Sequence, residues 1–133
     1  MPRILIADDN ALARRTLRSV LESEPSAENV EICGEADNGE IAVGKTESLR
    51  PDVVILDICM PVLNGLAAAR IIRDSSPATV ILMVSLDHDR QTIDAARSAG
   101  ARGYVKKEDA AGTLMLALRA LLQGYEFFPI ASS

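Results

Sequence analysis

The feature that most constrains this sequence is a regular alternation of short apolar runs with longer amphipathic stretches. The apolar runs are too short for helices, and the stretches between them carry apolar residues at helical spacing. Five such pairs predict a parallel sheet covered by helices on both faces, with right-handed crossovers. The expected strands are 3–7, 30–34, 52–57, 79–85 and one beginning at 103–106. The expected helices are 13–21 (ended by Pro25), 38–49, 65–73, 90–99 (ended by Gly100) and 114–122 (ended by Gly124).

The composition is that of one soluble globular domain. The chain has 133 residues, 48% hydrophobic and 25% charged, which suits a single core. A net charge of −5 argues against a basic nucleic-acid-binding surface. Cys33 and Cys59 form no C-x-x-C pair and are expected to be reduced thiols. There is no apolar signal region and no apolar run of about 18 residues, so we expect a cytoplasmic protein without a membrane segment.

Polar side chains gather where the expected strands end. In open α/β sheets, ligands bind beyond the carboxyl ends of the strands. Carboxylates crowded at such an edge repel one another unless a cation joins them, and hard oxygen ligands suit Mg²⁺. A nearby lysine would act as a counter-ion or as a ligand for an added anion. The residues concerned are Asp8, Asp9, Asp57, Ser85, Lys106 and Lys107.

Each of these residues also has a purely structural explanation. Asp8 or Asp9 could cap the first helix, and Asp57 could begin a turn. Ser85 could cap a loop, and the lysines could simply be solvated. Each of these explanations would suffice for one residue alone. The presence of all these residues at one edge favours a functional site.

Four segments in order match one protein family. They are ILIADDN, PDVVILDICMPVLNG, VILMVS and GYVKKE. The second follows D-x-x-M-P-x-x-x-G, with Asp57, Met60, Pro61 and Gly65 in place. On these motifs the chain resembles, over essentially its whole length, the receiver domain of two-component response regulators. The resemblance implies a flavodoxin-like (βα)5 three-layer sandwich, whose five-stranded parallel sheet has the order 2-1-3-4-5.

The resemblance implies a metal site and a phosphoacceptor. Asp57 would accept a phosphoryl group from a sensor histidine kinase. Asp9 would bind Mg²⁺ (or Mn²⁺) directly, and Asp8 would act mainly through metal-bound water. The backbone carbonyl of Cys59 would be the remaining protein ligand, together with Asp57 itself.

The resemblance also implies switch residues. Ser85 would be the hydroxyl that binds a phosphoryl oxygen, and Tyr104 the aromatic residue beside it. The lysine that contacts the phosphoryl group would be Lys107 rather than Lys106. Glu108 stands where many receivers have proline, so a Lys-Pro cis peptide bond is absent.

The segments GEADNGEIAV and ALRALLQGYEFFP resemble the NarL/FixJ (LuxR-type) subfamily. In that subfamily a helix-turn-helix DNA-binding domain normally follows a linker. We therefore expect a receiver domain at 1–124 and, at 125–133, a frayed tail or the start of a linker to an output domain that this sequence lacks. Whether the chain is truncated or stands alone is left open.

The expected function is a phosphorylation switch that alters a protein–protein contact and controls transcription through an output domain. The chain would catalyse only its own phosphorylation and dephosphorylation, and would not bind DNA itself; homodimerisation is left open. One alternative is a stand-alone or phosphorylation-independent receiver-like interaction module. An aspartyl phosphatase is disfavoured, because Cys59 stands where such enzymes carry a second carboxylate. A flavodoxin-like nucleotide binder is disfavoured because Asp8 and Asp9 would repel phosphate.

Overall fold

A computed structural model describes residues 1–23 and 30–129. Five parallel strands form one sheet in the order β2-β1-β3-β4-β5, as predicted. No helix in these two ranges is both long enough and apolar enough to cross a membrane. The strands are β1 (Arg3–Ala7), β2 (Glu31–Ala36), β3 (Val53–Leu56), β4 (Val80–Ser85) and β5 (Gly103–Lys106). The helices are α1 (Ala11–Ser23), α2 (Gly39–Leu49), α3 (Gly65–Ser75), α4 (Arg90–Ser98), the 3₁₀ turn η1 (Lys107–Asp109) and α5 (Ala110–Leu122).

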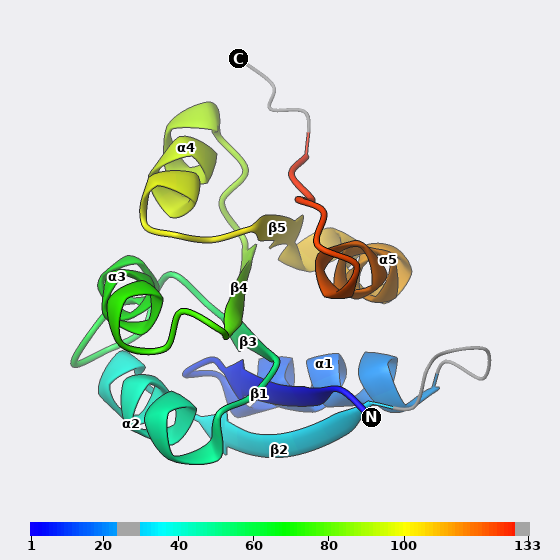
Figure 1. Cartoon of the computed structure of the whole chain (residues 1–133). Coiled ribbons are helices and arrows are strands. Elements are labelled where there is room, and N and C mark those ends of the chain that lie inside the picture. The colour runs from blue at the N-terminus through cyan, green and yellow to red at the C-terminus, as the bar shows by residue number, and fades with distance from the viewer. Residues whose placement is uncertain (24–29, 130–133) are drawn as a thin grey trace.

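The sheet is the middle of three layers. Helices α1 and α5 cover one face, and α2, α3 and α4 cover the other (Figure 1). Side chains of β1 alternate between the two layers of core, because successive residues of a strand point to opposite faces. Leu5 packs beneath α2–α4, whereas Ile4 and Ile6 pack beneath α1 and α5. Burial on both faces explains why β1, β3 and β4 are nearly continuous apolar runs, whereas the edge strand β2 is more polar.

Short polar side chains begin several helices. Asn10 Oδ1 accepts a hydrogen bond from the amide of Ala13 at 2.9 Å, and Asn64 caps α3 in the same way. The cap of α1 is therefore Asn10 and neither of the two preceding aspartates. Gly100 and Gly124 end α4 and α5 in the left-handed region, with φ of +111° and +90°, as their positions predicted.

Some boundaries differ from the expectation. The second strand continues to Ala36, and α5 begins at Ala110, four residues before its apolar stripe becomes regular. The turn η1 starts the helical path early, so the polar residues just after β5 are already helical. The predicted helix stop at Pro25 lies outside the described residues.

The segment after α5 is not frayed over residues 125–129. The amide of Tyr104 donates to the carbonyl of Phe127 at 2.8 Å, and the amide of Phe127 donates to the carbonyl of Arg102 at 3.0 Å. A parallel bridge thus joins Gly103 and Phe127 at the edge of the sheet. The expectation of a frayed end is therefore wrong for this part, while the expected linker role stays a prediction.

Candidate functional site

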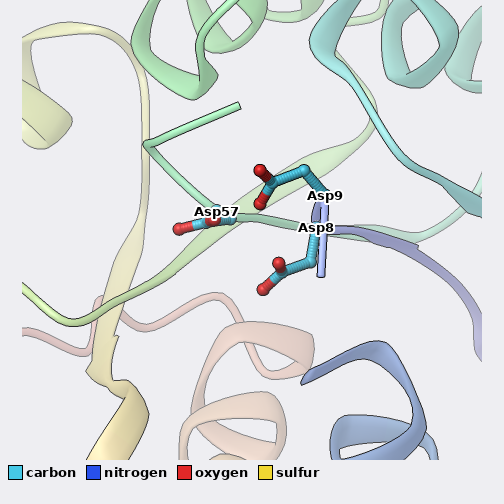
Figure 2. A group of neighbouring side chains, drawn as sticks. All are labelled: Asp8, Asp9 and Asp57. Atoms are coloured by element: carbon cyan, nitrogen blue, oxygen red, sulfur yellow. The ribbon is translucent and has the colours of Figure 1, made fainter. Parts of the chain in front are cut away.

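Three carboxylates meet at the carboxyl edge of the sheet. Asp8 follows β1 and Asp57 follows β3, and the amide of Asp57 donates to the carbonyl of Ala7 at 2.9 Å. This pairing places the two neighbouring strand ends at the same level. One ligand oxygen from each of Asp8, Asp9 and Asp57 lies within 4.8 Å of the others (Figure 2). Asp8 is fully buried and Asp57 is 5% exposed, while Asp9 faces solvent.

A lysine ammonium balances part of this charge. Lys107 Nζ lies 2.7 Å from Asp8 Oδ2 and 3.5 Å from Asp57 Oδ2. Lys107 is the first residue of η1, so its side chain turns back over the ends of β1 and β3. Lys106 ends β5 and pairs with Ser85 in the sheet, and it forms no ion pair with any residue that the structure describes. The geometry therefore brings Lys107, and not Lys106, to the carboxylates.

The pKa values reflect this crowding. Burial and the neighbouring Asp8 charge raise the pKa of Asp57 to about 6, although Lys107 and the backbone amide of Cys59 act in the opposite direction. Burial alone would lower the pKa of Lys107. The close ion pair with Asp8 and the charges of Asp57 and Asp8 outweigh this effect of burial, so the pKa of Lys107 is raised. One ammonium thus compensates for the carboxylates only in part.

The residues fit a hard divalent cation. Asp8 Oδ2 is a buried oxygen without a properly aligned hydrogen-bond donor, even though Lys107 Nζ is close to it. Buried carboxylate oxygens normally have partners, and three acidic groups with one such oxygen form a ligand set typical of Mg²⁺. Asp8, Asp9 and Asp57 would hold the ion. The ion would supply positive charge beside any phosphoryl group that approaches Asp57.

Ser85 and Tyr104 are connected through one loop residue. Ser85 Oγ accepts a hydrogen bond from the amide of Asp87 at 3.2 Å, and the Tyr104 hydroxyl donates to the carbonyl of Asp87 at 2.5 Å. Ser85 is almost fully buried and Tyr104 is fully buried. Ser85 thus caps the loop after β4 here, and the backbone of Asp87 links both predicted switch residues. Sequence reasoning missed Asp87, although a residue two positions after a serine is a normal partner for a hydroxyl turn.

The loop between β3 and α3 depends on Gly65. Its amide donates to the carbonyl of Ile58 at 2.8 Å. A Cβ atom at this position would lie 2.0 Å from the carbonyl oxygen of Asp57, which is inside van der Waals contact. The final glycine of the D-x-x-M-P-x-x-x-G motif therefore lets α3 begin directly against the backbone of Asp57.

The arginines of α1 are largely paired. Arg14 Nη1 donates to the backbone carbonyl of Asp8 at 2.6 Å, and its Nε donates to Glu35 at 3.0 Å. Arg18 forms a second ion pair with Glu35 at 2.7 Å. These contacts lower the pKa of Glu35, mainly through the hydrogen bond from Arg18, against a smaller opposing effect of burial. The sequence did not show that Glu35 pairs with these arginines, because β2 and α1 meet only in the folded chain.

Fold and site together define a class of protein: an α/β domain with an acidic pair, a buried aspartate, a hydroxyl and a lysine at one sheet edge. The family model of the response regulator receiver domain matches residues 4–119. The chain belongs to this family.

Its relatives include an enzyme and a transcriptional regulator. The chain is 41% identical over 110 residues to a protein-glutamate methylesterase/protein-glutamine glutaminase of Alkalilimnicola ehrlichii, covering 81% of this chain and 27% of that protein. It is 34% identical to the transcriptional regulatory protein LnrK of Bacillus subtilis, covering 97% of this chain and 57% of that protein. The chain thus spans between about a quarter and somewhat over half of the length of these relatives.

Solved structures agree on the fold. A LuxR-family two-component response regulator from Aurantimonas superposes with a TM-score of 0.88 at 28% identity, over 96% of this chain and 89% of that one. The signal receiver domain of the putative response regulator NarL from Mycobacterium tuberculosis gives a TM-score of 0.85 at 28% identity, over 92% and 97%. The CheB response regulator domain of Thermotoga maritima also matches, with a TM-score of 0.80 at 29% identity, over 90% and 94%. The likeness therefore extends over more than one subfamily.

Proposed function

We propose that this chain is a phosphoacceptor receiver of the NarL/FixJ type. It takes a phosphoryl group from a sensor histidine kinase onto Asp57, with Mg²⁺ or Mn²⁺ bound. The observation that supports this best is the surrounding of Asp57: a nearly buried carboxylate with two further aspartates beside it and the Lys107 ammonium 3.5 Å away. Burying these carboxylates together costs folding stability, whereas together with a cation and Lys107 they can bind an incoming phosphoryl group.

The chemistry follows from the charges. A carboxylate oxygen of Asp57 attacks phosphorus, the P–N bond of the phosphohistidine breaks, and the imidazole leaves with the bonding electron pair. Two anionic groups must approach one another, so positive charge at the site lowers the barrier. Lys107 supplies part of that charge from the protein itself. The product is an acyl phosphate that adds up to about two negative charges and three acceptor oxygens.

The new oxygens provide the switching signal. In the unmodified chain Ser85 Oγ accepts a hydrogen bond from the amide of Asp87. A charged phosphoryl oxygen would be a strong acceptor for the proton of the Ser85 hydroxyl. When Ser85 turns toward the phosphoryl group, the Asp87 backbone loses that contact, and the Tyr104 hydroxyl bound to the same residue is affected. The chain is thus a signalling switch with two states, and it catalyses only its own phosphorylation and dephosphorylation.

The output is a changed protein–protein contact, with a sister receiver or with an attached domain. LnrK is a transcriptional regulatory protein, and one solved RcsB structure has two dimers on two DNAs. These relatives support control of a DNA-binding output domain. The methylesterase relatives favour a second candidate, control of an attached enzyme. Cytoplasmic location remains a prediction, as does the backbone carbonyl of Cys59 as a metal ligand.

The experiment that tests the proposal is phosphorylation with acetyl phosphate and Mg²⁺, followed by peptide mapping. We expect one added phosphoryl group, on Asp57, and none in a folded Asp57→Asn protein. Asp9→Ala should keep the fold but lose most of the Mg²⁺ dependence, because Asp9 is exposed and close to the other two carboxylates. Wild-type labelling of Asp57→Asn at another residue would refute the assignment, and unchanged Mg²⁺ affinity in Asp9→Ala would refute the ligand role.

A further inference from the structure

The structure places residues 125–128, the tail segment, across the exposed edge of β5. Phe127 packs against the core beneath α1 and α5, whereas Phe128 packs against the core beneath α2–α4. Consecutive side chains on opposite faces are the pattern of a strand. The tail segment therefore continues the sheet at its open edge and touches both layers of the core.

Three elements hold the tail segment. Helix α5 holds its start, because the amide of Tyr125 donates to the carbonyl of Ala120 at 2.9 Å. Strand β5 and Arg102 just before it hold the segment through the two backbone hydrogen bonds of Phe127, to Tyr104 and to Arg102. Helix α4 holds it through Arg97, whose guanidinium lies 3.3 Å from Glu126 and 4.0 Å from the ring centroid of Phe128. The Arg97 contacts are the weaker attachment, because both members of the ion pair are about half exposed.

The β5 attachment includes Tyr104. The backbone amide of Tyr104 binds the tail segment, while the hydroxyl of the same residue binds the carbonyl of Asp87. Asp87 also binds Ser85 and lies in the loop that leads into α4. A continuous set of contacts thus runs from the carboxyl edge of the sheet to residues 125–128.

We propose that the tail segment is the element that reads the state of Asp57, and that phosphorylation loosens its attachment to α4. This inference rests on the proposed function. Modification pulls Ser85 and the loop after it toward Asp57, and α4 follows that loop while β5 stays in the sheet. The tail segment is attached to both, so a shift of α4 relative to β5 must break the weaker, Arg97-mediated attachment.

A tryptophan reporter tests this directly, since the chain has no tryptophan of its own. In Phe128→Trp, beryllofluoride with Mg²⁺ should raise acrylamide quenching of the indole by about twofold, as expected for a partly buried ring that becomes exposed. The matched control is Tyr125→Trp, on the same segment at a site already 66% exposed, where no change is expected. Adding Asp57→Asn should abolish the response.

A second variant keeps the test decisive if the tryptophan disturbs packing. Coupling is reciprocal, so removing the α4 attachment must favour the phosphorylated-like state. Arg97→Ala should tighten beryllofluoride binding, measured by calorimetry, on the order of threefold. Arg90→Ala, on the exposed first turn of the same helix, should leave it unchanged.

The inference and the proposed function fail in different ways. Peptide mapping can show a phosphoryl group on Asp57 while indole quenching in Phe128→Trp and the beryllofluoride affinity of Arg97→Ala both stay unchanged. In that case the tail proposal is overturned and the proposed function stands. If Asp57 takes no phosphoryl group, the proposed function fails and this inference fails with it.

Discussion

Asp57 is a residue whose environment opposes the charge that it must carry. Its pKa is raised from 3.8 to about 6 because the carboxylate is buried beside Asp8. Between these two pH values the folded chain binds more protons at Asp57 than the unfolded chain does. Stability therefore falls as the pH rises through this window, and the loss is complete above about pH 6. A bound cation would offset this loss, because its positive charge stabilises the ionised carboxylates of Asp57 and Asp8.

We predict that Asp57→Asn stabilises the metal-free protein at pH 8 by roughly 2 kcal/mol. Near pH 4 the difference should nearly vanish, because wild-type Asp57 is then protonated when folded. Urea unfolding of both proteins across this pH range measures the effect. With saturating Mg²⁺ the stability difference between Asp57→Asn and the wild type should become smaller or change sign. Only the wild type keeps the Asp57 carboxylate as a ligand for the ion. A stability difference that does not depend on pH would contradict the prediction.

Lys107 and Lys106 provide a matched pair of substitutions. Lys107 is mostly buried and faces two carboxylates, so Lys107→Ala leaves Asp8 and Asp57 without their counter-ion. We expect Lys107→Ala to lower the free energy of unfolding by about 3 kcal/mol at pH 8 without metal. Lys106→Ala should change it by less than about 0.5 kcal/mol. Equal losses in the two variants, measured by denaturant unfolding, would show that the Lys107 contacts are not specific.

At the scale of elements, the start of α3 depends on a glycine, whereas the middle of α2 does not. A Cβ atom at Gly65 would overlap the carbonyl of Asp57, but a Cβ atom at Gly44 would meet nothing within 4 Å. Gly65 brings α3 against the end of β3 at Asp57, whereas Gly44 lies in an ordinary helix interior.

We predict opposite signs for the same substitution at these two positions. Gly65→Ala should destabilise the protein by about 2 kcal/mol or more and slow phosphorylation, because α3 and the end of β3 must move apart. Gly44→Ala should stabilise it by about 0.5–1 kcal/mol, because alanine favours a helix interior. Thermal unfolding and acetyl phosphate labelling provide the two readouts. A stabilising Gly65→Ala would contradict the close approach described above.

At the scale of the whole molecule, charge decides what the surface can bind. The chain carries a net charge of −5. The densest group of basic residues in its sequence lies on α1. Ion pairs of Arg14 and Arg18 with Glu35 neutralise part of its positive charge. Arg15 stays exposed on that helix. Little positive surface is therefore left there for a polyanion.

We accordingly predict that the chain does not bind duplex DNA by itself, with or without a phosphoryl group on Asp57. DNA affinity depends on the release of counterions by basic side chains. Fluorescence anisotropy at moderate salt should show no binding up to about 100 µM protein, where non-specific DNA-binding proteins already associate. Glu35→Gln, which frees the α1 arginines, is the informative comparison. Micromolar affinity of the wild type with a steep salt dependence would contradict the prediction.

Much of this protein was determined locally by its sequence. Apolar runs with helical stretches between them predicted the layers, and the strand ends placed the acidic residues and both Lys106 and Lys107 at one edge. The family resemblance selected Lys107 from the two lysines. Such features depend on periodicity and on residues that lie close along the chain. The sequence also suggested Ser85 and Tyr104, although their roles as switch residues remain predictions.

Only the tertiary structure decided which groups meet across elements. Glu35 reaches two arginines from another strand, and Phe127 covers the edge of β5 instead of fraying. These contacts join residues far apart in the chain, and their partners depend on strand order and helix placement. A local sequence pattern specifies neither the strand order nor the helix placement, because both depend on how the whole chain packs.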